Sequence, residues 1–559
     1  MLDKLFEPET VAVVGASREE GKTGHEIFDN LLHDFDGDVV PVNPNAEKVH
    51  GEKAYDEIPR GTELAVIAVP AKIVPDIMEQ CGEKNVKSAI VISAGFSEIG
   101  EKGLEEEVLE KARKNDIELL GPNVLGLINT ENSMNASFAS KMPEKGDISF
   151  MSQSGAFCTA ILDYAKAQHI GFKNFVSLGN KSMIDEVDLL KKWREDDTEA
   201  ILSYTEGIDD GREFLEEAEH TSKNTPIIMV KSGRTDQGGS AASSHTGSIA
   251  GSYQAYQAAF RKCGIIKAES NRELLDYGRA FAYQNLPEGE NVAVVTNGGG
   301  AGVITADEIA ERGLELAQFT SETSRKLEDS MPDESGKSNP LDVIGDAGHD
   351  RYREALDAVI EDERVDSIIV ILTPQANTEI EKTAKTVLKA SEGTEKPVMT
   401  CFMGEKDVQG GIDILEENDI PDFEDPKDAV KALKEMNEYR KFQEGFRDYR
   451  EFGYDEEKAE KALENHSGYE DYEELLKAYD FNFPLTKVAE APNPAAEAAQ
   501  EVGYPSAINI RSSDIKHKTD IGGVQTGIEN RKEAKEAFNE TIERGYDHNT
   551  GSNINGVVV

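Results

Sequence analysis

The chain has 559 residues, which predicts roughly three to five units that each bury a core of their own. It carries 108 acidic and 60 basic residues, so its formal net charge is −48, spread along the whole length. This charge argues against a nucleic-acid partner and favours a salt-rich, halophilic cytoplasm, with a basic protein partner as the weaker alternative.

The spacing of the cysteines and the lack of long apolar segments limit the class of protein further. The four cysteines lie far apart at positions 81, 158, 263 and 401, so the sequence predicts neither a disulfide framework nor a zinc site, and no metal ligands are assigned. The N-terminus lacks a basic region followed by an apolar run, and no stretch of about 18 apolar residues occurs. We therefore expect a cytoplasmic, soluble protein.

Over residues 1–130, short β-branched runs alternate with helical segments. These runs cover 10–14, 38–42, 64–69, 89–92 and 117–120, which predicts an α/β fold with a doubly wound parallel sheet, a Rossmann-like domain. Ligands of such sheets bind at the carboxyl ends of the strands. The loop residues expected to bind a ligand there are Gly15, Ser17, Lys22, Asn43, Pro44, Pro70, Ser93, Gly95, Pro122 and Asn123.

The loop sequences favour coenzyme A as that ligand. The first loop, residues 15–24, is not the tight G-x-G-x-x-G turn of dinucleotide sites, and Asn43-Pro44 stands where a ribose-binding acid is expected. An adenine nucleotide with an extra phosphate fits better, with Ser17 and Lys22 placed to meet phosphates. A generic Rossmann-like domain and an NAD-linked dehydrogenase remain the alternatives.

Two glycine-rich turns connect a strand to a helix further along the chain. The first is Ser154-Gly155 after 148–151, and the second is Gly298-Gly299-Gly300 after 292–295. Each offers free N–H groups and the positive end of a helix dipole, which together make a phosphate-binding site. Close packing explains either turn equally well when it is taken alone.

His245 lies between these turns in a run of small and hydroxyl residues, 240–248. Small neighbours admit a tetrahedral group to the imidazole, and hydroxyl groups can bind its oxygens, which suits a phosphorylated histidine. Glu206 ends an expected strand and can orient the ring. The two glycine turns would then clasp one phosphoryl group, and the segment 339–342 can line the same cavity. The alternatives are a polar loop and a solvated acid.

In these motifs the chain resembles the ADP-forming acyl-CoA synthetases, which are related to succinyl-CoA synthetase, and its acidity indicates a haloarchaeal source. The resemblance implies CoA binding by residues 1–130, two flavodoxin-like CoA-ligase domains at 142–285 and 288–440, and phosphorylation of His245 with the help of Glu206. It also implies acyl phosphate and phosphohistidine intermediates between acyl-CoA and ATP, with acetate or another short acid as the product. The matching motifs are 13–17, 41–44, 121–126, 152–155, 176–181, 206–207, 244–247 and 297–299.

The C-terminal part departs from that family pattern. A charged linker is expected at 441–466, and 467–559 resembles the first part of an ATP-grasp module for ADP/ATP, in which His517 matches a phosphoryl-relay position. Asn509 replaces a nucleotide-binding lysine, for which Arg511 can substitute. The Mg²⁺ ligands are expected outside this sequence.

Three explanations of this partial module stay open: a second chain that completes it, a degenerate module, or a fragment. We expect a homo- or hetero-oligomer and no membrane partner. A CoA-sensing or acyltransferase-associated scaffold is the alternative to the ligase.

Overall fold

The computed structural model describes residues 2–235, 237–238, 253–445, 454–464, 469–482, 484–515, 517–548 and 553–559. His245 therefore lies outside the described residues. The chain divides into two compact units, Met1–Phe446 and Arg447–Val559, each of which is described by itself. The described residues include no helix long and apolar enough to cross a membrane.

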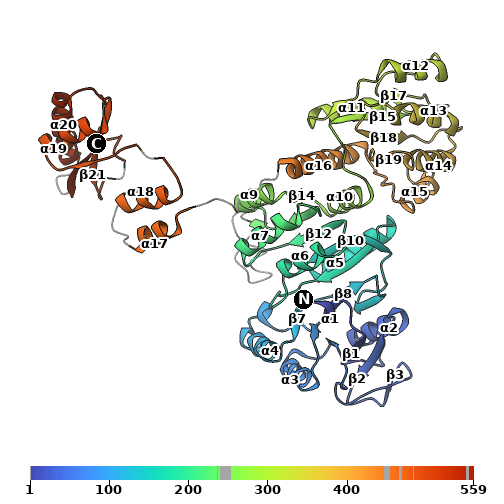
Figure 1. Ribbon diagram of the computed structural model, residues 1–559. Coiled ribbons are helices and arrows are strands. Elements are labelled where there is room, and N and C mark those ends of the chain that lie inside the picture. Colours follow the sequence, from blue (N-terminus) through green and yellow to red (C-terminus); the bar gives the residue numbers. More distant parts are fainter. Residues whose placement is uncertain are drawn as a thin grey trace. The chain divides into compact units, whose positions relative to one another are not determined.

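The first sheet of the N-terminal unit confirms the predicted parallel, doubly wound arrangement (Figure 1). Its strand order is β2-β1-β5-β6-β7, so the order reverses at β1, which is the first strand in the chain. The strands are β1 (Thr10–Val14), β2 (Asp38–Val42), β5 (Leu64–Ile67), β6 (Ser88–Val91) and β7 (Glu118–Leu120). The other elements are α1 (Asp3–Phe6), α2 (Thr23–Asp34), β3 (Lys48–Val49), β4 (Glu52–Lys53), η1 (Ala71–Ile73), α3 (Val74–Lys84), η2 (Ser97–Ile99) and α4 (Lys102–Lys114).

The second sheet has seven strands in the order β14-β13-β12-β10-β11-β8-β9. Five are parallel, and the hairpin β8–β9 adds to β11 in the antiparallel sense. The strands are β8 (Gly126–Asn129), β9 (Met134–Ser137), β10 (Lys145–Ser152), β11 (Phe172–Ser177), β12 (Ala200–Thr205), β13 (Ile227–Lys231) and β14 (Ile266–Ala268). The helices are α5 (Gly155–Ala167), α6 (Glu186–Arg194), α7 (Gly211–Thr221), α9 (Tyr253–Cys263) and α10 (Asn271–Tyr283).

The third sheet repeats the parallel pattern, with the strand order β16-β15-β18-β19 and β17 paired to β15. Its strands are β15 (Asn291–Thr296), β16 (Glu315–Leu316), β17 (Leu341–Asp342), β18 (Ser367–Leu372) and β19 (Val398–Phe402). The helices are α11 (Gly299–Glu311), α12 (Ser321–Ser330), α13 (His349–Ile360), α14 (Ile380–Ser391), α15 (Gln409–Glu416) and α16 (Pro426–Gly445).

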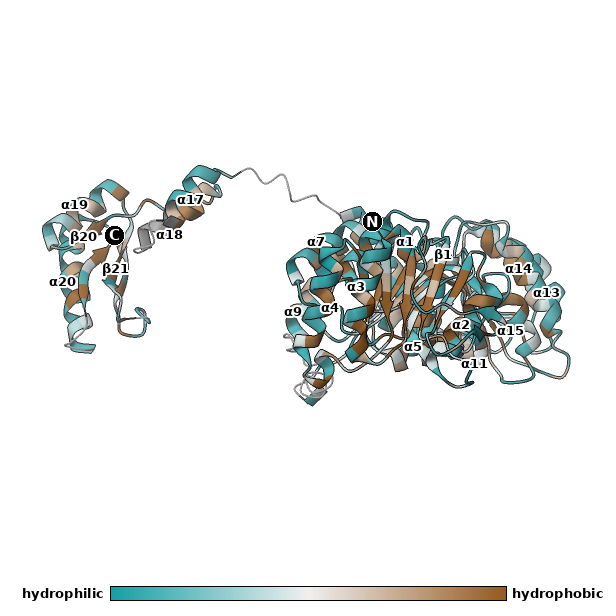
Figure 2. Cartoon of the chain, turned by 90° about the horizontal axis from the view of Figure 1, so that it is seen from below, coloured by the Kyte–Doolittle hydropathy of each residue, from teal (hydrophilic) through white to brown (hydrophobic). Residues whose placement is uncertain are grey.

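Shared hydrophobic clusters join the three sheets into one unit. One cluster combines β1 residues such as Val11 with Met151 and Trp193 of the second domain. Another combines Phe150 of the second sheet with Ile369 and Met399 of the third. Figure 2 shows the same pattern, with hydrophobic strands inside and hydrophilic helix surfaces outside. Burial on this scale supplies the main favourable free energy of folding.

The segment predicted as a charged linker begins inside α16 rather than after it. Phe442 packs against the cluster that joins the second and third sheets, and Gln443 donates a hydrogen bond to the carbonyl of Lys223 at 2.9 Å. These contacts explain why a highly charged sequence continues as helix as far as Gly445.

The C-terminal unit holds a sheet of order β20-β23-β21-β22. The strand β23 (Ile554–Val558), which covers the expected core strand at the end of the sequence, pairs with both neighbours. The remaining elements are α17 (Glu456–Glu464), α18 (Tyr469–Ala478), β20 (Val488–Ala489), α19 (Pro492–Val502), β21 (Ser506–Ser512), β22 (Val524–Ile528) and α20 (Arg531–His548).

All four cysteines are buried and unpaired. Burial raises the pKa of the Cys81 and Cys158 thiols to about 12. Since the thiolate is the reactive form, both side chains are inert core residues at neutral pH.

Candidate active site

A cavity of about 640 Å³ connects the first two domains. One wall comes from the carboxyl ends of β5 and β6, and the other comes from the turn into α5 and its first residues. Four of the predicted site residues, Ser93, Asn123, Ser154 and Gly155, line this cavity. The other lining residues are Thr23, Ala68, Val69, Ile92, Ala94, Val124, Leu125, Phe138, Gln153, Ala156 and Thr159.

The first loop reaches this region through two tight glycine contacts. Gly15 has φ +95°, and a Cβ there would lie 2.4 Å from the carbonyl oxygen of Ala68. A Cβ on Gly24 would lie 2.1 Å from the carbonyl oxygen of Gly15. Only glycine therefore lets α2 start against the loop. Lys22 precedes α2 as an exposed cation, 3.7 Å from Glu19, and the Ser17 hydroxyl accepts the Glu19 N–H.

The remaining predicted CoA-binding residues lie in the loops after the other strands of the first sheet. The Asn43 side chain ties the second loop to the first by donating to the carbonyl of Ala16 at 2.7 Å. The N–H of Gly95 donates to the Glu98 carboxylate, so an acid of the same chain already binds this amide. Pro44 and Pro70 are exposed, whereas Pro122 is buried.

The turn from β10 into α5 leaves room for a ligand at Gly155. Ser152 and Ser154 exchange hydrogen bonds of 3.0 Å, and the Ser154 hydroxyl caps the helix by accepting the Phe157 N–H at 3.3 Å. A Cβ on Gly155 would meet nothing in the described chain closer than 3.8 Å. Packing therefore does not require glycine here, and the open N-terminus of a 13-residue helix is suited to an anion.

Glu206 follows β12, as predicted, and its main chain is tightly held. Gln153 accepts the N–H groups of Glu206 and Gly207 at 2.7 and 3.0 Å and donates to the carbonyl of Gly207 at 2.6 Å. The Glu206 side chain is 8% exposed, and its Oε2 atom has no hydrogen-bond partner among the described residues. A buried carboxylate oxygen without a donor is costly, so this atom is available to a partner such as an imidazole N–H.

A buried ion pair supports the same turn. Lys181 donates to the carbonyl of Gly207 at 2.8 Å and pairs with Glu186 at 3.1 Å, and Gln153 also donates to Glu186. Burial opposes the charge on Lys181, but Glu186 and Asp209 outweigh it and raise the lysine's pKa. Burial likewise raises the pKa of Glu186, against the effect of Lys181.

The second glycine turn repeats the hydrogen bonds of the first. Thr296 bonds to both main-chain groups of Gly298, at 3.0 and 3.1 Å, as Ser152 does to Ser154. Asn297 accepts the N–H of Thr373 at 2.7 Å, as Gln153 does for Glu206. The two turns differ at the helix end, because a Cβ on Gly299 would lie 2.8 Å from the Asp342 carboxylate. Asp342, from the segment 339–342, thus lies against this turn.

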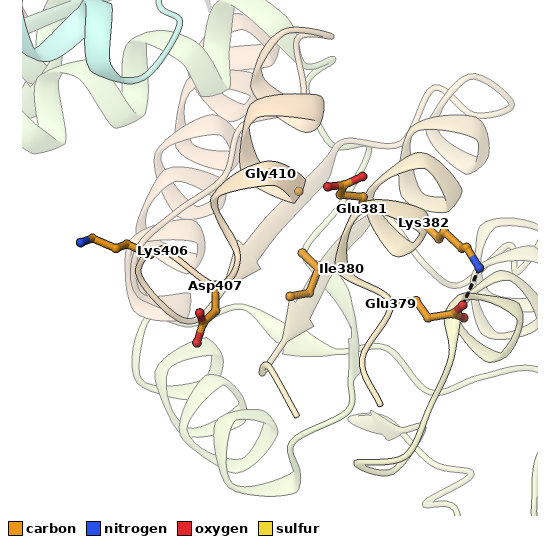
Figure 3. Close-up of a pocket in the computed structure, with 8 residues that line it drawn as sticks. Glu379, Ile380, Glu381, Lys382, Lys406, Asp407 and Gly410 are labelled. Atoms are coloured by element: carbon orange, nitrogen blue, oxygen red, sulfur yellow. Dashed lines mark hydrogen bonds and ion pairs between the residues drawn. The ribbon is translucent and has the colours of Figure 1, made fainter. Parts of the chain in front are cut away.

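A separate hollow of about 460 Å³ lies beside the helix starts of α14 and α15, and no predicted site residue lines it (Figure 3). Lys382 pairs with Glu379 at 2.6 Å, and Lys406 points away from Glu381 and Gly410. Of the two lysines that line this hollow, Lys382 is therefore paired with a carboxylate of the same chain.

Other predicted residues are not brought into the described site. His245 lies outside the described residues, so its clasp by the two glycine turns stays a prediction. His517 is exposed in the segment between β21 and β22 of the other unit, where Asn509 and Arg511 lie half-buried on one face of β21. The described residues include no group of three or more His, Cys, Asp or Glu fit to hold Mg²⁺.

The prediction from sequence did not single out Gln153 or Lys231 as site residues. Gln153 stands inside the Ser152–Gly155 motif, and Lys231 ends a β-branched run directly before Ser232-Gly233. A lysine that closes an otherwise apolar strand is the signal that points to it.

Comparison with known proteins matches each part of the chain to a family model. These are the CoA binding domain at residues 9–130, the succinyl-CoA ligase like flavodoxin domain at 145–281, the Ligase-CoA domain at 292–440 and the ATP-grasp domain at 458–559. Acetate–CoA ligase (ADP-forming) I of Archaeoglobus fulgidus is 41% identical over 572 residues, covering 100% of this chain and 82% of that protein. The chain belongs to the ADP-forming acyl-CoA synthetase family.

This synthetase also resembles members with other substrates in their names. The 4-hydroxybutyrate–CoA ligase (ADP-forming) of Nitrosopumilus maritimus is 33% identical and covers 99% of this chain and 82% of that protein. A solved structure of the dinucleotide-forming acetyl-coenzyme A synthetase 1 of Candidatus Korarchaeum cryptofilum, in complex with phosphate and ADP, has a TM-score of 0.76 and 36% identity. The match covers 79% of this chain and 98% of the chain in the solved structure. The family assigns the chain as an acid–CoA ligase, an enzyme that forms a carbon–sulfur bond.

Proposed function

We propose that this synthetase converts acyl-CoA, phosphate and ADP into free acid, CoA and ATP by way of a phosphohistidine at His245, and that it catalyses the reverse reaction. The cavity between the first two domains carries the proposal. It connects the strand ends predicted to bind CoA with the open N-terminus of α5, so a thioester and a phosphate can meet in one space.

The proposed reaction proceeds in three steps. A phosphate oxygen attacks the thioester carbonyl, the carbon–sulfur bond breaks, and the CoA thiolate leaves and takes a proton. An unprotonated nitrogen of His245 then attacks phosphorus, the bond from phosphorus to the acyl oxygen breaks, and the carboxylate leaves. Finally an oxygen of the ADP β-phosphate takes the phosphoryl group as the P–N bond breaks.

Glu206 and the α5 turn have distinct roles in this scheme. The unpartnered Oε2 of Glu206 accepts the other imidazole N–H of His245, which fixes the tautomer and stabilises the positive charge that develops on the ring. The N–H group of Gly155 binds a phosphoryl oxygen, and those of Gly299 and Gly300 supply the second predicted anion site. The N–H groups of Ser154 and Gly298 instead donate to the hydroxyls of Ser152 and Thr296, which shapes the two turns.

The acid is a short aliphatic one, with acetate first. Acetate and 4-hydroxybutyrate appear in the names of similar ligases, and the cavity wall includes the small apolar residues Ala68, Val69 and Ala156. A panel from acetate to hexanoate, together with aryl acids, tests this choice through kcat/KM. A higher kcat/KM for an aryl acid would overturn it.

The C-terminal unit delivers the phosphoryl group to the nucleotide. Its match to an ATP-grasp domain supports nucleotide binding by this unit and a relay through His517. We expect the active enzyme to be an oligomer or to include a partner chain.

Radiolabelled acetyl phosphate tests the proposal directly. The parent chain incorporates acid-labile ³²P, and His245→Ala does not. His517→Ala becomes labelled but fails to pass the label to ADP. If His245→Ala is labelled as fast as the parent, the phosphohistidine is wrong, and CoA binding without any label would instead support a CoA-sensing scaffold.

A further inference from the structure

Two side chains from neighbouring elements hold the main chain of Glu206 from opposite sides. Gln153, in the turn after β10, accepts the Glu206 N–H at 2.7 Å. Lys231, the last residue of β13, donates to the Glu206 carbonyl at 2.7 Å. Because β12 lies between β10 and β13 in the sheet, this clamp spans the carboxyl end of the strand that carries Glu206.

Lys231 is an unusual residue for a purely structural clamp. Its side chain is 4% exposed and forms no ion pair with a carboxylate of the described residues. Its ammonium group also donates to the carbonyl of Ser232 at 2.6 Å and lies 4.5 Å from the ring centroid of Tyr256. Burial lowers the lysine's pKa, and the negative charge of Glu206 acts in the opposite direction. Among the described residues, the ammonium group donates to carbonyl oxygens and lies against an aromatic ring, and burying a cation without a directly paired carboxylate is costly, so this lysine calls for a role.

The third sheet shows what this kind of turn needs for folding alone. There Asn297 holds Thr373 at the end of β18, just as Gln153 holds Glu206. In the second sheet, Thr205 of β12 pairs with Lys231 of β13. The corresponding pair in the third sheet is Leu372 of β18 with Phe402 of β19. The third sheet therefore builds the same turn with neither a carboxylate nor a lysine, so lysine occurs in the repeat that carries the acid.

We propose that Lys231 is a positioning residue that, with Gln153, holds Glu206 so that its free carboxylate oxygen meets the imidazole of His245. The inference rests on the proposed function. Lys231 fixes the carbonyl side of Glu206 and Gln153 fixes the amide side, and the carboxylate oxygen Oε2, which has no hydrogen-bond partner among the described residues, is left to bind a partner. Lys231 touches neither the phosphoryl group nor the acyl group in this role.

A double-mutant cycle on the full chain tests this role. The variants Lys231→Met, Glu206→Gln and their combination are compared for the rate of ³²P incorporation from acetyl phosphate. Lys231→Met should slow labelling roughly 10- to 100-fold, the expected cost of misplacing a catalytic group. The combined variant should be no slower than Glu206→Gln alone, because the lysine acts only through that carboxylate.

Lys396→Met is the matched control. Lys396 is half-buried, whereas Lys231 is buried, but burial lowers the pKa of Lys396 too, and it likewise donates to two carbonyls, of Ile360 at 2.8 Å and Asp362 at 2.6 Å, in the third domain. It should label at the parental rate. Lys231→Gln, which keeps an N–H donor, should label at an intermediate rate, and it replaces Lys231→Met in the cycle if that variant does not fold.

The outcomes separate the two proposals. Multiplicative losses in the combined variant, or parental labelling by Lys231→Met, overturn the positioning role while labelling still depends on His245. Labelling that survives His245→Ala overturns the proposed function and the positioning role with it. Slow labelling by Lys231→Met, with no further loss in the combined variant, supports both.

Discussion

Replacing Gly155 with alanine separates ligand binding from folding at the first glycine turn. The new methyl group would lie 3.8 Å from the Leu125 amide nitrogen and 3.9 Å from its Cβ, which are ordinary van der Waals distances. Gly155 is the first residue of α5 and does not need a positive φ. Alanine has a higher helix propensity than glycine by up to about 1 kcal/mol, so the variant should melt at the same temperature or slightly higher.

Gly155 also lines the cavity, so the added methyl group takes up space beside the N–H group that is proposed to bind a phosphoryl oxygen. Losing one hydrogen bond to a charged group costs about 1.5–3 kcal/mol, equivalent to roughly a 10- to 150-fold slower reaction. We therefore expect Gly155→Ala to fold normally and to incorporate ³²P at His245 at least tenfold more slowly.

Thermal unfolding and the rate of acid-labile labelling, measured on the same preparation, provide the assay. Gly103→Ala is the control, because Gly103 also lies in the first turn of a helix, α4, and a Cβ there would meet nothing within 4 Å. Gly103 does not line the cavity, so its variant should keep the parental labelling rate. Parental labelling by Gly155→Ala would refute the argument that this glycine makes room for phosphate.

Three further predictions concern charge. Lys22→Ala should raise KM for CoA roughly two- to fivefold and leave kcat unchanged, because an exposed ion pair contributes free energy on this scale. Lys48→Ala is the control and should change neither constant. A lower kcat for Lys22→Ala would contradict a role in binding alone. Burial and the nearby charge of Glu438 raise the pKa of Glu435 from 4.5 to about 7. Between these pH values the folded chain keeps the proton and the unfolded chain releases it, so the free energy of unfolding falls as the pH rises. Glu435→Gln should therefore raise the free energy of unfolding at pH 8, on the order of 1–3 kcal/mol, and should not change it near pH 4. Glu438→Gln should lower the free energy of unfolding at pH 8, because Lys434 and Lys441 lower the pKa of Glu438 and so stabilise its charged form. Equal effects of the two variants at pH 8 would contradict this assignment. With a net charge of −48, the melting temperature should rise by several degrees from 0.1 M to 2 M KCl but not with sucrose of matched osmolality; an equal rise in sucrose would rule out charge screening.

Local patterns in the sequence predicted the strands and the parallel arrangement of the first sheet, together with two glycine-rich helix starts. Most strands of that sheet are short apolar runs, several of them rich in β-branched residues, and such runs are typical of buried parallel strands. The glycine turns before α5 and α11 were found in the same way, because a strand followed by glycines and an amphipathic run is a signal contained in about twenty residues.

The hairpin β8–β9 was not predicted. Its residues, 126–137, extend the second sheet by pairing with β11, and nothing in their own sequence names that partner. Similarly, the sequence places Gly95 among the loop residues expected to bind the cofactor, and only the structure shows that Glu98 accepts its N–H. Antiparallel pairing and capping of a loop amide depend on which atoms the fold brings near.

The sequence by itself determined which groups are available for chemistry: a histidine among small residues, two glycine-rich helix starts that are suited to an anion, and an acid at a strand end. Only the tertiary structure decided how the acid is held. Gln153, Glu206 and Lys231 are separated by 53 and 25 residues, and they meet because the sheet places β12 between β10 and β13. Strand order depends on long-range packing that no local periodicity encodes, so this clamp became visible only in the folded chain.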